Sequence, residues 1–193
     1  MTNYIDTLRQ VILEPAEFFA KAKKESGFGN ALKYYAVSFA LYSVLLAVTV
    51  FAWTSSPLSQ IYTALIASYG LAFIAGYQLV LGASVFVTIF ITSVIASAMG
   101  ARTNFHETFR LLGYVAAAFM PLALVPFVGF LIQLYGLYVV YKGVRVTYGF
   151  GAGKTVLFLV AYSLAGAAVG FGLTLFLMPD YWTISIQAQL ASQ

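Results

Sequence analysis

The residues best suited to chemistry include a glycine-rich string near the last apolar run. It reads Gly-Phe-Gly-Ala-Gly-Lys-Thr from Gly149 to Thr155, and it resembles a phosphate-binding loop at first sight. Such a loop needs a glycine five residues before the glycine that precedes its lysine, and Tyr148 occupies that position. The spacing therefore favours a glycine-rich turn, with Lys154 close to lipid phosphate, over nucleotide binding.

His106 is the only histidine of the chain, and Glu107 follows it. One histidine beside one carboxylate provides neither the ligand set of a metal site nor a supported nucleophile. The chain has no cysteine, so thiolate chemistry and disulfides are excluded. We expect no catalytic residue, no metal site and no cofactor, and hence a protein that is not an enzyme.

The composition points to the membrane. Hydrophobic residues make up 62% of the 193 residues and charged residues only 8%, whereas a soluble domain carries roughly a quarter charged residues. The net charge of +4 comes from short basic clusters between long apolar runs, which favours anionic lipid headgroups over nucleic acid. We expect an all-α integral membrane protein.

Uncharged stretches between the basic clusters give the expected spans. A polar, proline-containing break at 54–60, an interfacial turn before Gly70 and a hinge at Pro126–Gly129 divide these stretches. One tilted helix is the alternative for 111–141, but both flanks of that stretch are basic. Cytoplasmic loops attract Lys and Arg, so an even number of spans must separate them. The predicted five transmembrane helices are about 34–53, 72–98, 111–126, 128–141 and 156–178.

This topology places all ten Lys and Arg residues on one side of the membrane. The amino terminus is expected in the cytoplasm and residues 179–193 form an extracytoplasmic tail. Residues 1–30 form an amphipathic cytoplasmic segment, divided at Pro15 where a second short helix begins, and lying flat on the leaflet. The expected transmembrane domain is 31–178. The cations expected to meet lipid headgroups are Lys21, Lys23, Lys24, Lys142, Arg145 and Lys154.

The expected spans contain no Asp, Glu, Lys, Arg or His, which argues against a proton relay or an ion pathway. Gln78 and Gln133 are their strongest polar groups, and we expect hydrogen bonds across helices rather than a pore. Small residues four apart, such as Gly166 and Gly170, favour close helix packing within the bundle, with a homo-oligomer as the alternative. Pro121 and Pro126 free backbone carbonyls, which favours burial of this region against other helices.

Several segments, taken in order, resemble a known family. They are Leu13-Glu-Pro-Ala-Glu-Phe-Phe19 followed by lysines, Gly113-Tyr114 with Pro121 after it, the turn at 126–129, and the stretch from Tyr141 to Gly149. Their order and spacing resemble the Ypt-interacting protein (Yip) domain family of five-span membrane proteins. We expect Gly113, Tyr114, Pro121, Pro126 and Gly129 to be packing or hinge positions.

The resemblance implies a membrane protein whose eukaryotic relatives bind Rab-type small GTPases and act in vesicle trafficking and organelle shape. The chain lacks their long amino-terminal extension and their Asp-Leu-Tyr-Gly-Pro signature, so it is more similar to compact prokaryotic members, located in the plasma membrane. The function we expect is membrane organisation or the scaffolding of a membrane or peripheral protein partner. The alternative is a channel or facilitator for a small neutral or hydrophobic solute.

Overall fold

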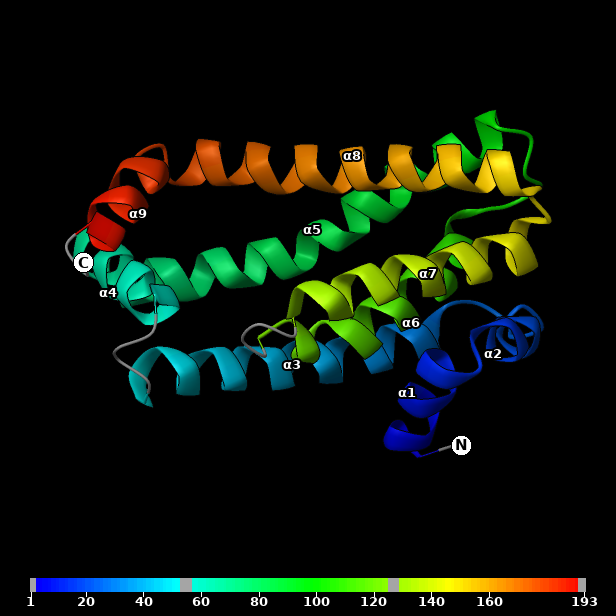
Figure 1. Ribbon diagram of the computed structural model, residues 1–193, viewed down its shortest axis with the longest axis horizontal. Helices are drawn as coiled ribbons and strands as arrows, with labels where there is room; N and C mark the ends of the chain where they lie inside the picture. Colours follow the sequence, from blue (N-terminus) through cyan, green and yellow to red (C-terminus); the bar gives the residue numbers. More distant parts are fainter. Residues whose placement is uncertain (1–2, 53–56, 125–128, 191–193) are drawn as a thin grey trace.

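Three long helices set the length of the molecule. A computed structural model, which describes residues 3–52, 57–124 and 129–190, is helical throughout its regular elements in these ranges (Figure 1). The helices α3 (Gly29–Ala52), α5 (Leu71–Ala98) and α8 (Ala152–Leu177) run along the longest axis. They are roughly 36, 42 and 39 Å long at the helical rise, which exceeds a hydrocarbon core of about 30 Å.

The centre of the bundle is a shorter helical hairpin. Its first arm is α6 (Phe105–Phe119), followed by the 3-10 turn η1 (Pro121–Leu124), and its second arm is α7 (Gly129–Tyr148). The α6 arm packs against α3, α5 and α7, and it is the most buried of the apolar helices. The end of η1 and the start of α7 lie well short of the far ends of α3, α5 and α8 (Figure 1). The predicted hinge residue Pro126 lies outside the described residues, and Gly129 is the first residue of α7.

The amino-terminal segment forms two helices, α1 (Tyr4–Leu13) and α2 (Pro15–Ala22). The second begins at Pro15 as predicted, because proline fits the first turn of a helix. Its apolar face is turned to the protein: Phe18 and Phe19 are 8% and 1% exposed and belong to the core that α6 and α7 also form. The side chains that were expected to lie in the lipid interface therefore cover α6 and α7 instead.

The opposite end carries its own small core. The helix α4 (Pro57–Tyr69) precedes α5, and Gly70 between them has a φ of 83°, a left-handed conformation that glycine adopts without strain. Residues 181–190, which the sequence assigned to a tail, form the helix α9 (Tyr181–Leu190) packed against α4. Leu65, Ile74 and Met178 are buried where α4, α5 and the end of α8 meet. We call this the far end.

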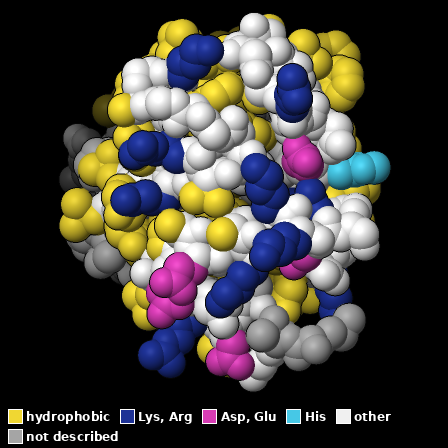
Figure 2. Space-filling model, turned by 90° about the vertical axis from the view of Figure 1, so that its right-hand side faces the viewer, with side chains coloured by type: hydrophobic (Ala, Val, Ile, Leu, Met, Phe, Trp, Pro, Cys, Tyr) yellow, Lys and Arg dark blue, Asp and Glu magenta, His cyan; other side chains and the backbone are white. Residues whose placement is uncertain are grey.

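The positive charges gather at the other end, which we call the basic end. All ten Lys and Arg residues belong to segments that meet there: α1, the end of α2, the start of α3, the loop before α6, α6 itself, the end of α7 and the start of α8. Figure 2 shows this face, on which Lys and Arg side chains are spread among acidic and apolar ones. The loop between α5 and α6 is short, because the Asn104 side chain accepts a hydrogen bond from the Glu107 amide and starts α6 at Phe105. Arg110 is therefore helical and only 7% exposed.

Large apolar side chains cover the outside of the bundle between its two ends. Val44 of α3, Leu79 of α5 and Leu164 of α8 are 60%, 65% and 65% exposed. Among the described residues, four helices are long and apolar enough to cross a membrane: Gly29–Ala52, Leu71–Ala98, Phe105–Leu124 including η1, and Ala152–Leu177. Exposing such a continuous apolar surface to water would be unfavourable, so these side chains face lipid.

Candidate functional site: a polar cavity at the basic end

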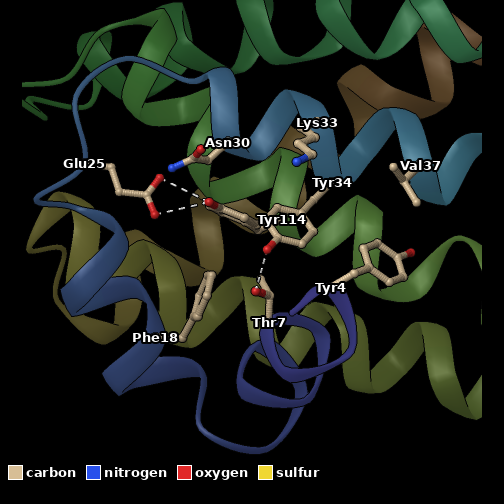
Figure 3. A pocket seen from close by; sticks show the side chains of 9 residues that line it. All are labelled: Tyr4, Thr7, Phe18, Glu25, Asn30, Lys33, Tyr34, Val37 and Tyr114. Carbon is tan, nitrogen blue, oxygen red and sulfur yellow. Dashed lines mark hydrogen bonds between the residues drawn. The ribbon is translucent and has the colours of Figure 1, made fainter. Parts of the chain in front are cut away.

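A cavity of about 180 Å³ opens between α1, the loop after α2, the first turns of α3, and α6. Figure 3 shows the side chains around it, which come from the first 37 residues of the chain and from Tyr114 in α6. The cavity combines one carboxylate, one ammonium group, an amide and several aromatic rings. Its lining residues are Tyr4, Thr7, Phe18, Glu25, Asn30, Lys33, Tyr34, Val37 and Tyr114.

Aromatic rings form one wall of this cavity and hold α1 and α2 against the bundle. The rings of Tyr4 and Tyr34 stack with centroids 5.7 Å apart, and those of Phe18 and Tyr114 meet edge to face at 4.9 Å. Tyr34 and Tyr114 are themselves 5.7 Å apart. Pairs in these geometries contribute about 0.5–1.5 kcal/mol beyond the area that they bury, so the wall is preorganised.

The polar groups of the cavity are partly connected. The Tyr114 hydroxyl donates to both oxygens of Glu25, at 3.2 and 3.1 Å, and Thr7 donates to the Tyr34 hydroxyl at 2.9 Å. The half-buried Glu25 has no Lys or Arg nitrogen within ion-pair distance among the residues that the structure describes. A carboxylate has about four acceptor sites, so Glu25 retains capacity for a further donor.

Lys33, in the second turn of α3, lies across the cavity from Glu25, whereas Asn30, in the first turn, lies next to the Glu25 carboxylate (Figure 3). The cavity therefore has a negative side at Glu25 and a positive side at Lys33. Within the described ranges, no group of three His, Asp or Glu residues lies close enough to hold a metal ion.

The cations predicted to meet lipid headgroups lie at the basic end but not in this cavity. Lys21, Lys23 and Lys24 are exposed after the apolar part of α2. Lys142 and Arg145 line a separate depression between α2 and the turn after α7, and each lies over a tyrosine ring of its own helix. Lys154 donates to the Met99 carbonyl at 3.4 Å.

An aromatic cluster supports the turn between α7 and α8 next to these cations. Tyr148 contacts Phe150 and Phe158 and donates to the Thr108 hydroxyl at 2.9 Å. Burial raises the pKa of Tyr148 above its usual range, because burial disfavours the phenolate. The glycine-rich string from Gly149 onwards is thus a packed turn leading into α8, and Gly149 has a φ of 70°.

The predicted packing residues are found in several places. Gln78 donates to the Tyr62 hydroxyl at 2.6 Å and so links α5 to α4, whereas Gln133 lines a cavity of about 480 Å³ between α6, α7 and α8. Pro121 begins η1. A Cβ added to Gly113 would come within 3.0 Å of Phe109, whereas one added to Gly166 meets only Thr88 at 3.8 Å and one added to Gly170 meets nothing within 4 Å.

Sequence reasoning missed the cavity and the two closest helix approaches. Glu25 gave no local signal, because its partner Tyr114 is 89 residues away in the chain, and Lys33 gave none either. A Cβ on Gly82 would overlap Phe39, and one on Gly143 would overlap Leu111. Neither glycine has another glycine four residues away, the spacing of the pair Gly166 and Gly170 that the sequence analysis singled out.

These features define a class: an all-helical, multi-pass integral membrane protein with a charged end and a polar cavity where that end meets the apolar belt. Within this class, the model of the Yip1 domain matches residues 9–174. The chain therefore belongs to the Yip1 domain family. Searches among curated proteins and among solved structures find no match.

Proposed function

We propose that this protein is a non-enzymatic organiser of the bilayer, with its basic end in the cytoplasm and partner proteins held at that end. The orientation follows from the ten Lys and Arg residues at one end, because positively charged segments are retained in the cytoplasm. The amino terminus is then cytoplasmic, and α9 at the far end lies outside.

The hairpin of α6 and α7 carries this proposal. From Arg110 to the end of η1 at Leu124 the chain rises roughly 22 Å at the helical rise, and from Gly129 to Tyr141, just before Lys142, roughly 18 Å. Both distances are short of the hydrocarbon thickness of about 30 Å, although Phe105–Leu124 is long enough to cross when its polar first turns are included. We therefore infer three complete spans, α3, α5 and α8, and a hairpin of α6 and α7 that enters from the basic side and does not cross.

This arrangement takes up different areas in the two leaflets. The leaflet at the basic end contains α6 and α7 beside the three spans, with α1 and α2 packed on them. The hairpin reaches only part of the way into the other leaflet. A protein that occupies more area in one leaflet favours curvature that is convex on that side, and this supports a role in membrane shape. It also leaves the charged surface of Figure 2 free for peripheral partners.

Vesicle shape tests this function. We expect the purified chain, reconstituted into vesicles of uniform size, to convert them to smaller vesicles and tubules as the protein content rises. The basic end should lie on the convex side, measured by labelling Ser26→Cys with a membrane-impermeant maleimide, since the chain has no cysteine of its own. Vesicle diameters equal to those of protein-free controls in cryo-electron micrographs, or labelling confined to the concave side, would contradict the proposal.

The cavity around Gln133 supports the alternative function, a facilitator for small neutral solutes. It has a volume of about 480 Å³ and is lined largely by apolar side chains, with Gln133 and Tyr162 from α7 and α8 as polar groups. Solute flux in the same vesicles separates the two functions. Flux that depends on protein and falls in Gln133→Leu would replace the organiser by the facilitator, and we expect none above the protein-free rate.

A further inference from the structure

We propose that the cavity in Figure 3 binds the headgroup of a phospholipid with a primary ammonium and a phosphate, the chemistry of phosphatidylethanolamine. The cavity volume of about 180 Å³ is more than ten times the roughly 10–15 Å³ that holds one water, so the cavity can accommodate a group of several heavy atoms. This site is independent of the curvature proposal, because it rests on the cavity and not on the depth of the hairpin.

The ammonium belongs beside Glu25. Tyr114 uses its single donor on this carboxylate, and the remaining acceptor sites suit the N–H groups of a primary amine. The rings of Phe18 and Tyr34 line the same cavity, and aromatic faces attract ammonium groups. An anionic headgroup without an ammonium would bring its charge close to Glu25, which disfavours it.

The phosphate belongs on the other side. Lys33, in the second turn of α3, is the cation on that side and can form a charge-assisted hydrogen bond with a phosphate oxygen. Lys33 and Glu25 share the cavity without pairing to each other, as no ion pair joins them in the described part of the chain. A ligand with both charges satisfies the two sides at once.

An apolar face of α3 next to the cavity favours a lipid over a soluble amine as the ligand, because acyl chains can lie along it. Val37 lines the cavity and is also 45% exposed on the outside of α3. Leu41, Val44 and Val48 follow at steps of three or four residues and are 42%, 60% and 55% exposed. Residues at this spacing share one face of a helix. A chain attached to the bound phosphate would lie along this face towards the middle of the membrane.

The test measures lipid binding to the full-length protein in detergent, by native mass spectrometry with added phosphatidylethanolamine or phosphatidylglycerol. We expect the wild type to prefer phosphatidylethanolamine. Glu25→Gln should weaken its binding roughly tenfold, the effect of losing one charge-assisted hydrogen bond. Lys33→Met should weaken the binding of both lipids. The matched controls are Glu17→Gln and Lys21→Met, which are exposed on α2 and do not line the cavity.

A variant that changes the shape of the cavity but no charge distinguishes binding in this cavity from a general effect of surface charge on lipid binding. Val37→Trp fills the mouth of the cavity without changing any charge and should lower phosphatidylethanolamine binding while the helical circular dichroism is retained. The same binding by Glu25→Gln and Glu17→Gln, or a wild-type preference for phosphatidylglycerol, would overturn the proposal. Displacement of the lipid by equimolar ethanolamine phosphate would also overturn it, by identifying a soluble ligand.

Discussion

Gly143→Ala is expected to lower the stability of this protein by about 1–3 kcal/mol, the usual cost of overpacking a filled core. The added methyl group would overlap the end of Leu111 and come within 2.9 Å of the Phe19 ring. Leu111 and Phe19 are each 1% exposed, so neither side chain has space to move into. The midpoint of thermal unfolding in detergent should fall by roughly 3–10 °C.

Gly170→Ala is the matched control for this substitution. Gly170 lies in the α8 helix, and a Cβ there meets nothing within 4 Å. Its midpoint should stay the same or rise slightly, because alanine favours the helix more than glycine does. Equal midpoints for the two variants would mean that α2, α6 and α7 do not meet at Gly143 as the structure has them.

Proteolysis of the same variants reports on α2 directly. Phe19 belongs to α2, and Lys21, Lys23 and Lys24 follow it in the exposed segment before α3. Displacing Phe19 should therefore speed tryptic cleavage after these lysines in Gly143→Ala, several-fold above the wild type. A helix that lay on the lipid surface would be indifferent to a methyl group on α7, so unchanged cleavage would favour that location for α2.

The contrast between Gly143 and Gly170 also explains which parts of the fold the sequence could predict. Charge-free stretches and turn residues predicted the long helices well, because a charged side chain has a much higher free energy in lipid than in water. Lipid and protein interior are both apolar, however, so hydrophobicity does not tell which face of a span meets another helix. Gly166 and Gly170 had the expected spacing for close packing, yet the close approaches are at Gly82 and Gly143.

The same physical limit applies to the amino-terminal helices. The amphipathic pattern around Phe18 and Phe19 correctly predicts that one face is buried, but it fits a lipid interface and a protein surface equally well. The structure places both rings in the core formed with α6 and α7. The helix α9 was not predicted although Asp180, a common N-cap residue, directly precedes it, because residues 179–193 were taken as an extracytoplasmic tail. Contact with α4 supplies its burial.

The cavity could not be predicted because it is a tertiary feature. Glu25 is in a turn, Tyr114 is in the middle of α6 and Tyr4 begins α1, so no spacing in the sequence relates them. Tyr114 was singled out only for its place in the Gly113-Tyr114 motif. Its hydrogen bonds to Glu25 give that motif a physical role, because they tie the loop before α3 to the central hairpin.

The depth of that hairpin leads to the second large effect that we expect. A cysteine at Ala123, an exposed position of η1 close to the hairpin tip, should resist membrane-impermeant maleimides added from either side of the membrane. Thiols in hydrocarbon remain protonated and inaccessible to such reagents, because the reactive thiolate is not formed there. Two complete spans would instead bring this position into the water on the far side.

Two exposed positions calibrate the labelling. Ser26→Cys in the turn before α3 should react only from the cytoplasmic side, and Asp180→Cys before α9 only from outside. Both labels follow from the direction of α3, α5 and α8 and hold whether the hairpin spans or turns back, because either arrangement returns the chain to the basic end. Labelling of Ala123→Cys from outside, at the rate of Asp180→Cys, would thus establish two complete spans and remove the unequal leaflet areas on which the membrane-shaping role depends.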